Sequence, residues 1–337
     1  MNLAQLIAPW HIPGPVTFRQ IDIGFINAIF AVEAPSGRYV LRVYREPGDF
    51  SRIRHEHRVA IWLQQAGLSY AVPAPIPAAD GETLAAVAGP EGVSYVALIP
   101  FLPGTHPDFR HLNQAEAAGA ALGELVTALG ALRPDAAILA VPSYCELTRI
   151  HAEIPNPPAV VDWLPVEPAW RHRIGRLLES ALANVGSMYN RLPRQVIHGD
   201  LTHGNVLMED DRVTGLLDFE FSAWDLRAMD YAVGIGGGPK SLRSGWGDWA
   251  VLESFSRGYF RHHRLTAEEL EVLPDLIRLR RLNILLRFAG RYRQGLDPVS
   301  EVQGMAWWTL NAEDWLEASG AELVRRAQVW SDLYGRS

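Results

Sequence analysis

The segment VIHGDLTHGNVLMEDDRVTGLLDFE, residues 196–220, places acidic and amide side chains at the ends of short apolar runs. Asp200 follows the apolar run QVIHG, and Asn205 comes five residues later. An acidic turn at residues 209–211 then leads into a second apolar run, TGLL, which ends at Asp218. Because two apolar runs joined by a short polar turn are typical of a hairpin, we expect Asp218 to return toward Asn205. The segment therefore predicts carboxylate and amide oxygens gathered at the ends of two strands.

Oxygen donors of this kind suit phosphoryl transfer from a nucleotide. The reaction needs a carboxylate that orients or deprotonates the attacking hydroxyl, and oxygen ligands that hold Mg²⁺ on the phosphates. Asp200 is placed to accept a hydrogen bond from the hydroxyl of an acceptor, and Asn205 and Asp218 offer oxygen atoms to Mg²⁺. The alternative is that these residues only shape turns, which is a common role of Asp and Asn.

The pattern HGD-x4-N at residues 198–205, followed by DFE at residues 218–220, resembles the aminoglycoside phosphotransferase and choline kinase superfamily. That superfamily has the protein-kinase-like fold and includes the type II homoserine kinases. The resemblance implies that Asp200 is the catalytic base and that Asn205 and Asp218 bind Mg²⁺. It also implies that the chain uses ATP to phosphorylate a hydroxyl of a small molecule.

Two further residues are expected to support the loop. A histidine beside a catalytic aspartate most often braces the loop by hydrogen bonding, and we expect this role for His198. Asp230, in the run DLRAMDYA, matches a further acidic position of the family, and the resemblance implies a structural brace there.

Composition narrows the class of protein. The chain has 337 residues, of which 48% are hydrophobic, so it can bury a large core and is expected to form two lobes. The single cysteine, Cys145, and a start without a basic and then apolar run favour a cytoplasmic protein. A net charge of −7 argues against nucleic-acid partners, and no apolar run approaches the ~18 residues of a membrane helix. The oligomeric state is not predicted.

Alternating apolar residues and turn signals in the first hundred residues predict an antiparallel sheet with one helix. We expect the helix at 50–67 and the five strands at 16–22, 27–34, 38–45, 83–89 and 93–102.

Beyond Pro103-Gly104, apolar residues at helical spacing dominate, and we expect long helices at 112–132, 167–190, 265–294 and 298–335. The expected fold class is α+β, a bilobal protein-kinase-like fold with a five-stranded antiparallel N-lobe and a mainly helical C-lobe. We expect residues 1–102 to form a nucleotide-clamping lobe. Residues 103–337 would then carry the catalytic loop, the metal site and the acceptor pocket.

The cation expected on the third strand of a kinase is unusual in this chain. Kinases place a lysine there, but the only lysine of this chain is the distant Lys240. Arg42 is the candidate for the phosphate contact, because its guanidinium can bind a phosphate through two hydrogen bonds. Arg45 is the alternative, although it lies on the opposite face of the strand. Glu56, on the following helix, is the expected partner of Arg42; an exposed helix charge is the other interpretation.

The remaining nucleotide contacts are predicted from position. Gly24 and Asn27, in the turn between the first two strands, match the short loop that covers the phosphates, where backbone amides can face them. Leu98 and Phe101, at the end of the fifth strand, are expected to lie near the adenine.

The acceptor is predicted from the helical lobe. Residues 276–293 form an apolar helix that carries six arginines, which would repel a polycationic aminoglycoside and favour an acceptor with an acidic group. A homoserine-like amino alcohol fits this charge. The arginines can instead cover an outer face or pair with glutamates of neighbouring helices.

Other acceptors and an inactive protein stay open as alternatives. Five tryptophans of the helical lobe could form an aromatic cage for a choline-type acceptor, but large aromatics are more often core residues. An aminoglycoside kinase is a further alternative. The missing lysine also allows a catalytically inactive protein that binds a nucleotide.

Overall fold

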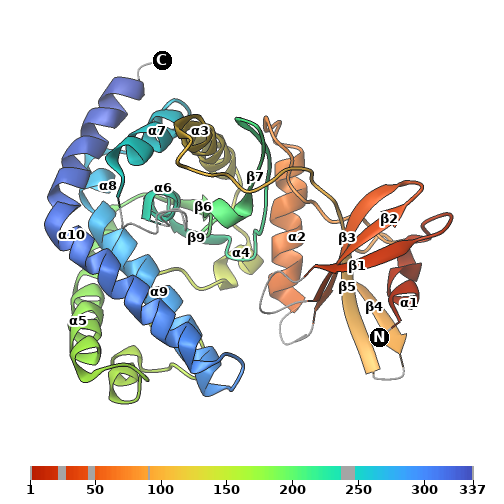
Figure 1. The fold of residues 1–337 in the computed structure, drawn as a ribbon, viewed down its shortest axis with the longest axis horizontal. Helices are drawn as coiled ribbons and strands as arrows, with labels where there is room; N and C mark the ends of the chain where they lie inside the picture. Colours follow the sequence, from red (N-terminus) through yellow and green to blue (C-terminus); the bar gives the residue numbers. More distant parts are fainter. Residues whose placement is uncertain (1, 22–27, 45–49, 90–91, 237–246, 336–337) are drawn as a thin grey trace. The chain divides into compact units, whose positions relative to one another are not determined.

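The structure is a computed structural model and describes residues 2–21, 28–44, 50–89, 92–236 and 247–335 (Figure 1). The chain forms two compact units. The first, hereafter the N-terminal unit, consists of residues 1–106, 206–209 and 213–221. The second, hereafter the helical unit, consists of residues 107–205, 210–212 and 222–337. The N-terminal unit thus contains chain from both sides of Pro103-Gly104, and the division at residues 102 and 103 stays a prediction.

A five-stranded antiparallel sheet forms the centre of the N-terminal unit, as predicted. Its strand order is β1-β2-β3-β5-β4. The strands are β1 (Thr17–Ile21), β2 (Ala28–Ala34), β3 (Gly37–Tyr44), β4 (Ala85–Gly89) and β5 (Gly92–Pro100). Alternate residues point to one side, where Phe30, Val32, Leu41, Val96 and Leu98 form a buried core. The period of two in the sequence therefore predicted the sheet correctly.

Two α-helices and a short 3₁₀ helix, Ala8–Trp10, accompany this sheet in the part of the chain that the structure describes. The predicted helix at 50–67 is α2 (Phe50–Gln64), and a short helix, α1 (Leu3–Ile7), was not predicted. Asn2 caps α1, because its side chain accepts a hydrogen bond from the amide of Gln5. Leu6 and Ile7 of α1 belong to the same core cluster as the sheet.

The predicted hairpin is present. It pairs β7 (Val206–Glu209) with β8 (Arg212–Leu216), and Asp210 in its turn has a positive φ of 53°. The hairpin attaches to the N-terminal unit through bridges from Thr105 to Met208 and from Ala71 to Gly215. These backbone bridges explain why part of the segment 196–220 leaves the helical unit.

The helical unit holds the long helices. In chain order its elements are α3 (Leu112–Leu129), α4 (Ala136–Ala140), α5 (Pro168–Arg191), β6 (Arg194–Ile197), β9 (Ala223–Leu226), α6 (Ala228–Gly236), α7 (Trp249–Phe260), α8 (Ala267–Glu271), α9 (Leu273–Arg293) and α10 (Val299–Tyr334). Three short 3₁₀ helices, at residues Leu147–Arg149, Pro157–Asp162 and His203–Asn205, join them. β6 and β9 pair antiparallel. No helix in the described ranges is long and apolar enough to span a bilayer.

The helix expected at 265–294 is in fact two helices, α8 and α9. Thr266 and Glu269 form a capping box that starts α8, and Pro274 lies in the first turn of α9. Proline has no amide hydrogen and is tolerated only in the first turn of a helix, so a new helix begins there.

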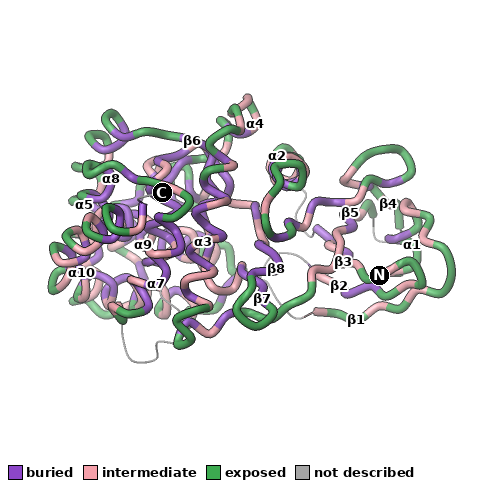
Figure 2. The backbone as a smooth tube through the Cα atoms, turned by 90° about the horizontal axis from the view of Figure 1, so that it is seen from above, coloured by how far each residue is buried: buried purple, intermediate pink, exposed green. Residues whose placement is uncertain are grey.

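Two pairs of helices pack closely in the helical unit. α3 crosses α7 where Gly119 faces the carbonyl of Phe255 and Gly258 faces the carbonyl of Glu116, and a Cβ at either glycine would clash with that backbone. α9 and α10 lie side by side (Figure 1). Residues 273–292 of α9 are buried or half-buried, with none exposed (Figure 2). The arginines between residues 278 and 291 are therefore half-buried, and none of them lies on a fully exposed face.

Candidate active site

The loop that follows β6 is held by one buried carboxylate. Asp230 accepts hydrogen bonds from the backbone amides of His198, at 2.9 Å, and Gly199, at 2.7 Å. Nδ1 of His198 accepts a hydrogen bond from the amide of Asp200 at 3.1 Å. Gly199 has a φ of +81°, which glycine adopts without steric cost. The predicted bracing roles of Asp230 and His198 are confirmed.

The environment of Asp230 is strongly desolvated. Its side chain is fully buried, and burial raises the pKa of Asp230 to about 7, although the two amide hydrogen bonds act in the opposite direction. Such a group is stable only because donors surround it, since a buried charge without them is very costly. The carboxylate thus fixes the backbone that leads into Asp200.

Asn205 is brought next to Asp200 by the same loop. Its Nδ2 donates a hydrogen bond to the backbone carbonyl of Asp200 at 2.8 Å, and its amide donates to the carbonyl of Thr202 at 2.9 Å. Because the side-chain nitrogen points at the Asp200 carbonyl, the side-chain oxygen lies on the other side of the amide group. An amide oxygen held this way is a suitable ligand for a hard cation.

Asp200 forms an ion pair that the sequence did not predict. Its Oδ1 pairs with the guanidinium of Arg280 on α9, and both side chains are largely buried. The guanidinium of Arg280 lies 5.6 Å from the centre of the Tyr144 ring. Tyr144 in turn donates a hydrogen bond from its hydroxyl to the carbonyl of Gly199. Arg280 therefore links the loop to α9, and Tyr144 links it to the segment that precedes the 3₁₀ helix Leu147–Arg149.

In the N-terminal unit, the predicted ion pair between Arg42 and Glu56 is present. Nη1 of Arg42 lies 2.7 Å from Oε1 of Glu56, and Nη2 lies 3.5 Å from Oε2 of Glu220. Burial alone would lower the pKa of Arg42, but Glu56, Tyr44 and Glu220 outweigh it and raise that pKa above the ordinary value. Arg42 is therefore a permanently charged cation between two carboxylates.

Asp218 belongs to the same unit as Arg42. Its φ is +65°, a left-handed conformation that is uncommon for residues other than glycine and recurs at functional sites. Phe219 is 1% exposed and anchors the segment, and the carbonyl of Glu220 accepts a hydrogen bond from Nε of Arg52 at 3.3 Å. The DFE segment is therefore fixed by α2. Glu220 belongs to the DFE motif but had no predicted role.

The other residues predicted at the nucleotide site either lie outside the described residues or have no tested role. Gly24, Asn27 and Arg45 lie outside the described residues. The carbonyl of Leu98 accepts from the amide of Ile76 at 2.8 Å, and the amide of Phe101 donates to the carbonyl of Arg38 at 3.1 Å. These backbone groups already have partners within the unit. The roles of Leu98 and Phe101 near adenine stay predictions.

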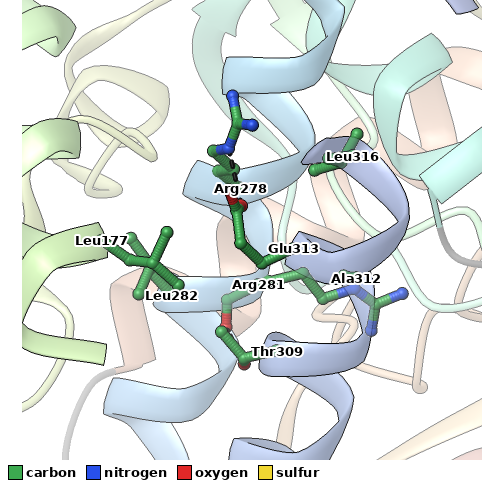
Figure 3. Close-up of a pocket in the computed structure, with 8 residues that line it drawn as sticks. All are labelled: Leu177, Arg278, Arg281, Leu282, Thr309, Ala312, Glu313 and Leu316. Carbon is green, nitrogen blue, oxygen red and sulfur yellow. Dashed lines mark hydrogen bonds and ion pairs between the residues drawn. The ribbon is translucent and has the colours of Figure 1, made fainter. Parts of the chain in front are cut away.

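One small pocket in the helical unit lies among its helices and is lined by eight residues of α5, α9 and α10 (Figure 3). It is too narrow to admit a water molecule. The ion pair between Arg278 and Glu313, at 2.7 Å, crosses it. The lining residues are Leu177, Arg278, Arg281, Leu282, Thr309, Ala312, Glu313 and Leu316. This pocket is a narrow gap between packed helices, and it offers no room for an acceptor.

The described ranges contain no group of three or more His, Cys, Asp or Glu side chains that could hold a metal by itself. Asn205, in the helical unit, carries one amide oxygen, and Asp218, in the N-terminal unit, carries one carboxylate. Mg²⁺ in nucleotide sites commonly takes only one or two carboxylates and completes its shell with phosphates and water. An amide oxygen and a carboxylate are therefore donor types that Mg²⁺ accepts beside a nucleotide.

Solved structures of similar fold are kinases. The microcompartment-associated aminopropanol kinase superposes with a TM-score of 0.68, 20% identity and coverage of 95% of this chain and 99% of that chain. The amicoumacin kinase hAmiN, in complex with AMP-PNP, Ca²⁺ and Ami, gives a TM-score of 0.67, 18% identity and coverage of 93% and 92%. A choline/ethanolamine kinase family protein from Mesorhizobium loti superposes with a TM-score of 0.62 and 18% identity, and the match covers 96% of each chain. The fold is thus the predicted kinase-like fold.

The model of the phosphotransferase enzyme family matches residues 17–273, and the chain belongs to this family. The homoserine kinase of Rhizobium meliloti (strain 1021) is 29% identical over 288 residues, which are 82% of this chain and 80% of that protein. The homoserine kinase of Granulibacter bethesdensis (strain ATCC BAA-1260 / CGDNIH1) is 28% identical over 302 residues, 85% and 83% of the two chains. The prediction of a small-molecule phosphotransferase is confirmed.

Proposed function

We propose that the chain is an ATP- and Mg²⁺-dependent kinase whose acceptor is the hydroxyl of a homoserine-like amino alcohol. The observation that carries this proposal is the loop after β6, in which the Asp230 carboxylate holds the backbone before Asp200 while Asn205 is tied to the Asp200 carbonyl. In this loop, the carboxylate proposed to accept the hydroxyl proton and the amide proposed to bind the metal are five residues apart, which supports the proposal. The relatives from Rhizobium meliloti and Granulibacter bethesdensis are homoserine kinases, which supports the proposed acceptor.

Asp200 would serve as the base of the reaction. The acceptor hydroxyl would donate a hydrogen bond to the Asp200 carboxylate, and its oxygen would attack the γ-phosphorus. A phosphorus–oxygen bond to the acceptor forms, the bond to the bridging oxygen breaks, and ADP leaves with that electron pair. The hydroxyl proton passes to Asp200. A proton acceptor of this kind contributes ~10²- to 10⁴-fold to a rate.

Asn205 and Asp218 would hold the metal. The side-chain nitrogen of Asn205 already donates to the Asp200 carbonyl, so the side-chain oxygen would be the atom that binds Mg²⁺. When bound, Mg²⁺ would neutralise charge on the β- and γ-phosphates. The hAmiN kinase, which has a similar fold, was solved in complex with the nucleotide analogue AMP-PNP and the divalent cation Ca²⁺. That complex supports the use of a nucleotide and a divalent metal by this chain.

Arg42 would contact the phosphates in place of a lysine. Glu56 and Glu220 keep the guanidinium charged and oriented. Gly24 and Asn27 would cover the phosphates, and Leu98 and Phe101 would border the adenine. Residues 1–102 would thus clamp the nucleotide, and residues 103–337 would hold the acceptor.

The test is a phosphate-transfer assay with purified protein, ATP and Mg²⁺. The acceptors are L-homoserine, the aminopropanol that lacks only its carboxylate, choline and an aminoglycoside. We expect transfer to L-homoserine at the highest kcat/KM, and loss of transfer when EDTA removes the metal. Transfer to choline or the aminoglycoside but not to L-homoserine would refute the proposed acceptor. Nucleotide binding without transfer to any acceptor would support the inactive alternative.

A further inference from the structure

Arg280 stands out among the arginines of α9 because of its partner. Arg278 pairs with Glu313 and Asp275, and Arg291 pairs with Asp297. These pairs are structural links within and between helices. Arg280 alone of these three has the proposed catalytic carboxylate, Asp200, as its partner. The Arg280 side chain is only 11% exposed.

The position of Arg280 is fixed from two sides. Its guanidinium lies against the face of Tyr144, a placement that attracts a cation to the ring electrons. Tyr144 is itself anchored, because its hydroxyl donates to the carbonyl of Gly199 and its amide donates to Oδ2 of Asp225 at 2.6 Å. Tyr144 therefore contacts both the loop before Asp200 and the guanidinium of Arg280.

Two guanidinium groups of α9 interact with Asp200. Arg281 follows Arg280 and donates a hydrogen bond to the carbonyl of Gly236. Burial and the charge of Arg280 lower the pKa of Arg281 to about 9, which still leaves it charged near neutral pH. Two guanidinium groups thus interact with the single carboxylate of Asp200.

Two nearby carboxylates already accept hydrogen bonds from other groups of the protein. Asp225 accepts hydrogen bonds from the Tyr189 hydroxyl and the Tyr144 amide, and burial raises the pKa of Asp225 to about 6. Asp230 is committed to the amides before Asp200, and burial raises its pKa further. Both groups are fully buried and face the backbone of the loop.

A guanidinium has capacity beyond one ion pair. It carries five N–H groups in a rigid fork, and the pair with Asp200 uses one terminal nitrogen, Nη2. The opposite edge of an arginine fork matches the spacing of a second carboxylate. A ligand carboxylate bound there would place the rest of a short molecule within reach of Asp200.

We propose that Arg280 recognises the carboxylate of the acceptor and thereby places the acceptor hydroxyl beside Asp200. This inference rests on the proposed kinase function and adds the residue that selects the acceptor class. Amino alcohols with a carboxylate a few bonds from the hydroxyl fit, because Arg280 and Asp200 are in direct contact. Acceptors without the carboxylate leave part of the fork unsatisfied and bind less well.

The test compares two acceptors in three proteins. The variants are Arg280→Gln, which removes the charge, and Arg280→Lys, which keeps the charge without the fork. The measured quantity is the ratio of kcat/KM for L-homoserine to kcat/KM for the aminopropanol that lacks only the carboxylate. We expect Arg280→Gln to lower this ratio about tenfold to a hundredfold, the loss typical of a hydrogen bond to a charged group. Arg280→Lys should recover part of it.

Arg293→Gln is the matched control, because it removes an exposed arginine from the end of the same helix. Its ratio should equal that of the unaltered protein. If Arg280→Gln lowers kcat/KM equally for both acceptors, Arg280 only positions Asp200 and the inference is wrong. The same conclusion follows if the unaltered protein prefers the acceptor without a carboxylate, although the kinase function would then stand.

If Arg280→Gln loses all turnover, a binding measurement still tests the inference. Calorimetry with L-homoserine in the presence of AMP-PNP and Mg²⁺ should show weaker binding to a folded variant, with fold checked by circular dichroism. Unchanged homoserine affinity would overturn the inference. Absence of phosphate transfer by the unaltered protein to every acceptor tested would instead refute the proposed function.

Discussion

The guanidinium of Arg42 contacts the carboxylate of Glu56 at 2.7 Å, and the pair links strand β3 to helix α2. The second terminal nitrogen of Arg42 lies 3.5 Å from Glu220. A lysine ammonium is a single point charge and cannot span both carboxylates with a fixed geometry. The arginine at position 42 therefore pairs with Glu220, the acidic residue that ends the DFE motif, as well as with Glu56.

Arg42→Met should weaken the use of ATP. We expect KM for ATP to rise about tenfold to a hundredfold, because a charge-assisted phosphate contact is lost. KM for ATP of Arg42→Lys should lie between those of Arg42→Met and the unaltered protein, because the lysine can pair with one carboxylate only. Steady-state kinetics with varied ATP measures the effect, and Arg19→Met on the exposed surface of β1 serves as the control. An unchanged KM in folded Arg42→Met would exclude the phosphate contact.

Asp200→Asn should abolish most of the turnover and spare nucleotide binding. The amide cannot take the hydroxyl proton, so kcat should fall ~10²- to 10⁴-fold. Binding of AMP-PNP, measured by calorimetry, should change little. Asp210→Asn is a suitable control, because this exposed turn residue has a positive φ that asparagine also tolerates. Retention of full kcat by Asp200→Asn would remove Asp200 from the mechanism.

Asp230→Asn should loosen the loop that carries Asp200. One carboxylate oxygen becomes an NH₂ group that faces a backbone N–H, so one of the two hydrogen bonds, to His198 or Gly199, is lost. We expect a loss of ~1–3 kcal/mol in the free energy of unfolding, measured in urea, together with a lower kcat. Asp248→Asn should be nearly neutral, because asparagine caps a helix as well as aspartate does. Equal stability of the two variants would contradict the brace.

His57 should make the protein less stable in acid. Burial, with a smaller effect of the Arg42 charge, lowers the pKa of His57 to about 4 from 6.5. Between these values the unfolded chain binds the proton and the folded chain does not, so the stabilising contribution is present above about pH 6.5 and is lost as pH falls to about 4. The full effect of this residue is at most ~3 kcal/mol.

The measurement is the free energy of unfolding in urea from pH 4 to pH 7. His57→Gln removes the titrating group, so its stability should fall less steeply with acid than that of the unaltered protein. His172→Gln, at an exposed position of α5, should keep the original slope. Parallel curves for His57→Gln and the unaltered protein would show that His57 does not govern this pH dependence.

Local sequence was a reliable guide to the strands and to the reactive loop. The alternation of apolar residues predicted β2 and β3, because each strand buries one face on the same core. The spacing from Asp200 to Asn205 predicted their proximity, because five residues of a tight turn cannot separate them far. The division of the helix near Pro274 was missed, since the apolar pattern continues across the break.

The sequence by itself determined which side chains carry chemistry, since the motif at residues 198–220 sets its own backbone turns. Only the tertiary structure decided that Arg280, eighty residues from Asp200, is its ion-pair partner. The same holds for Glu220 beside Arg42. Several arginines of α9 are spread along one helix, and their partners follow from which helix or loop packs against each face. A long-range contact depends on the packing of whole elements, which no local spacing encodes.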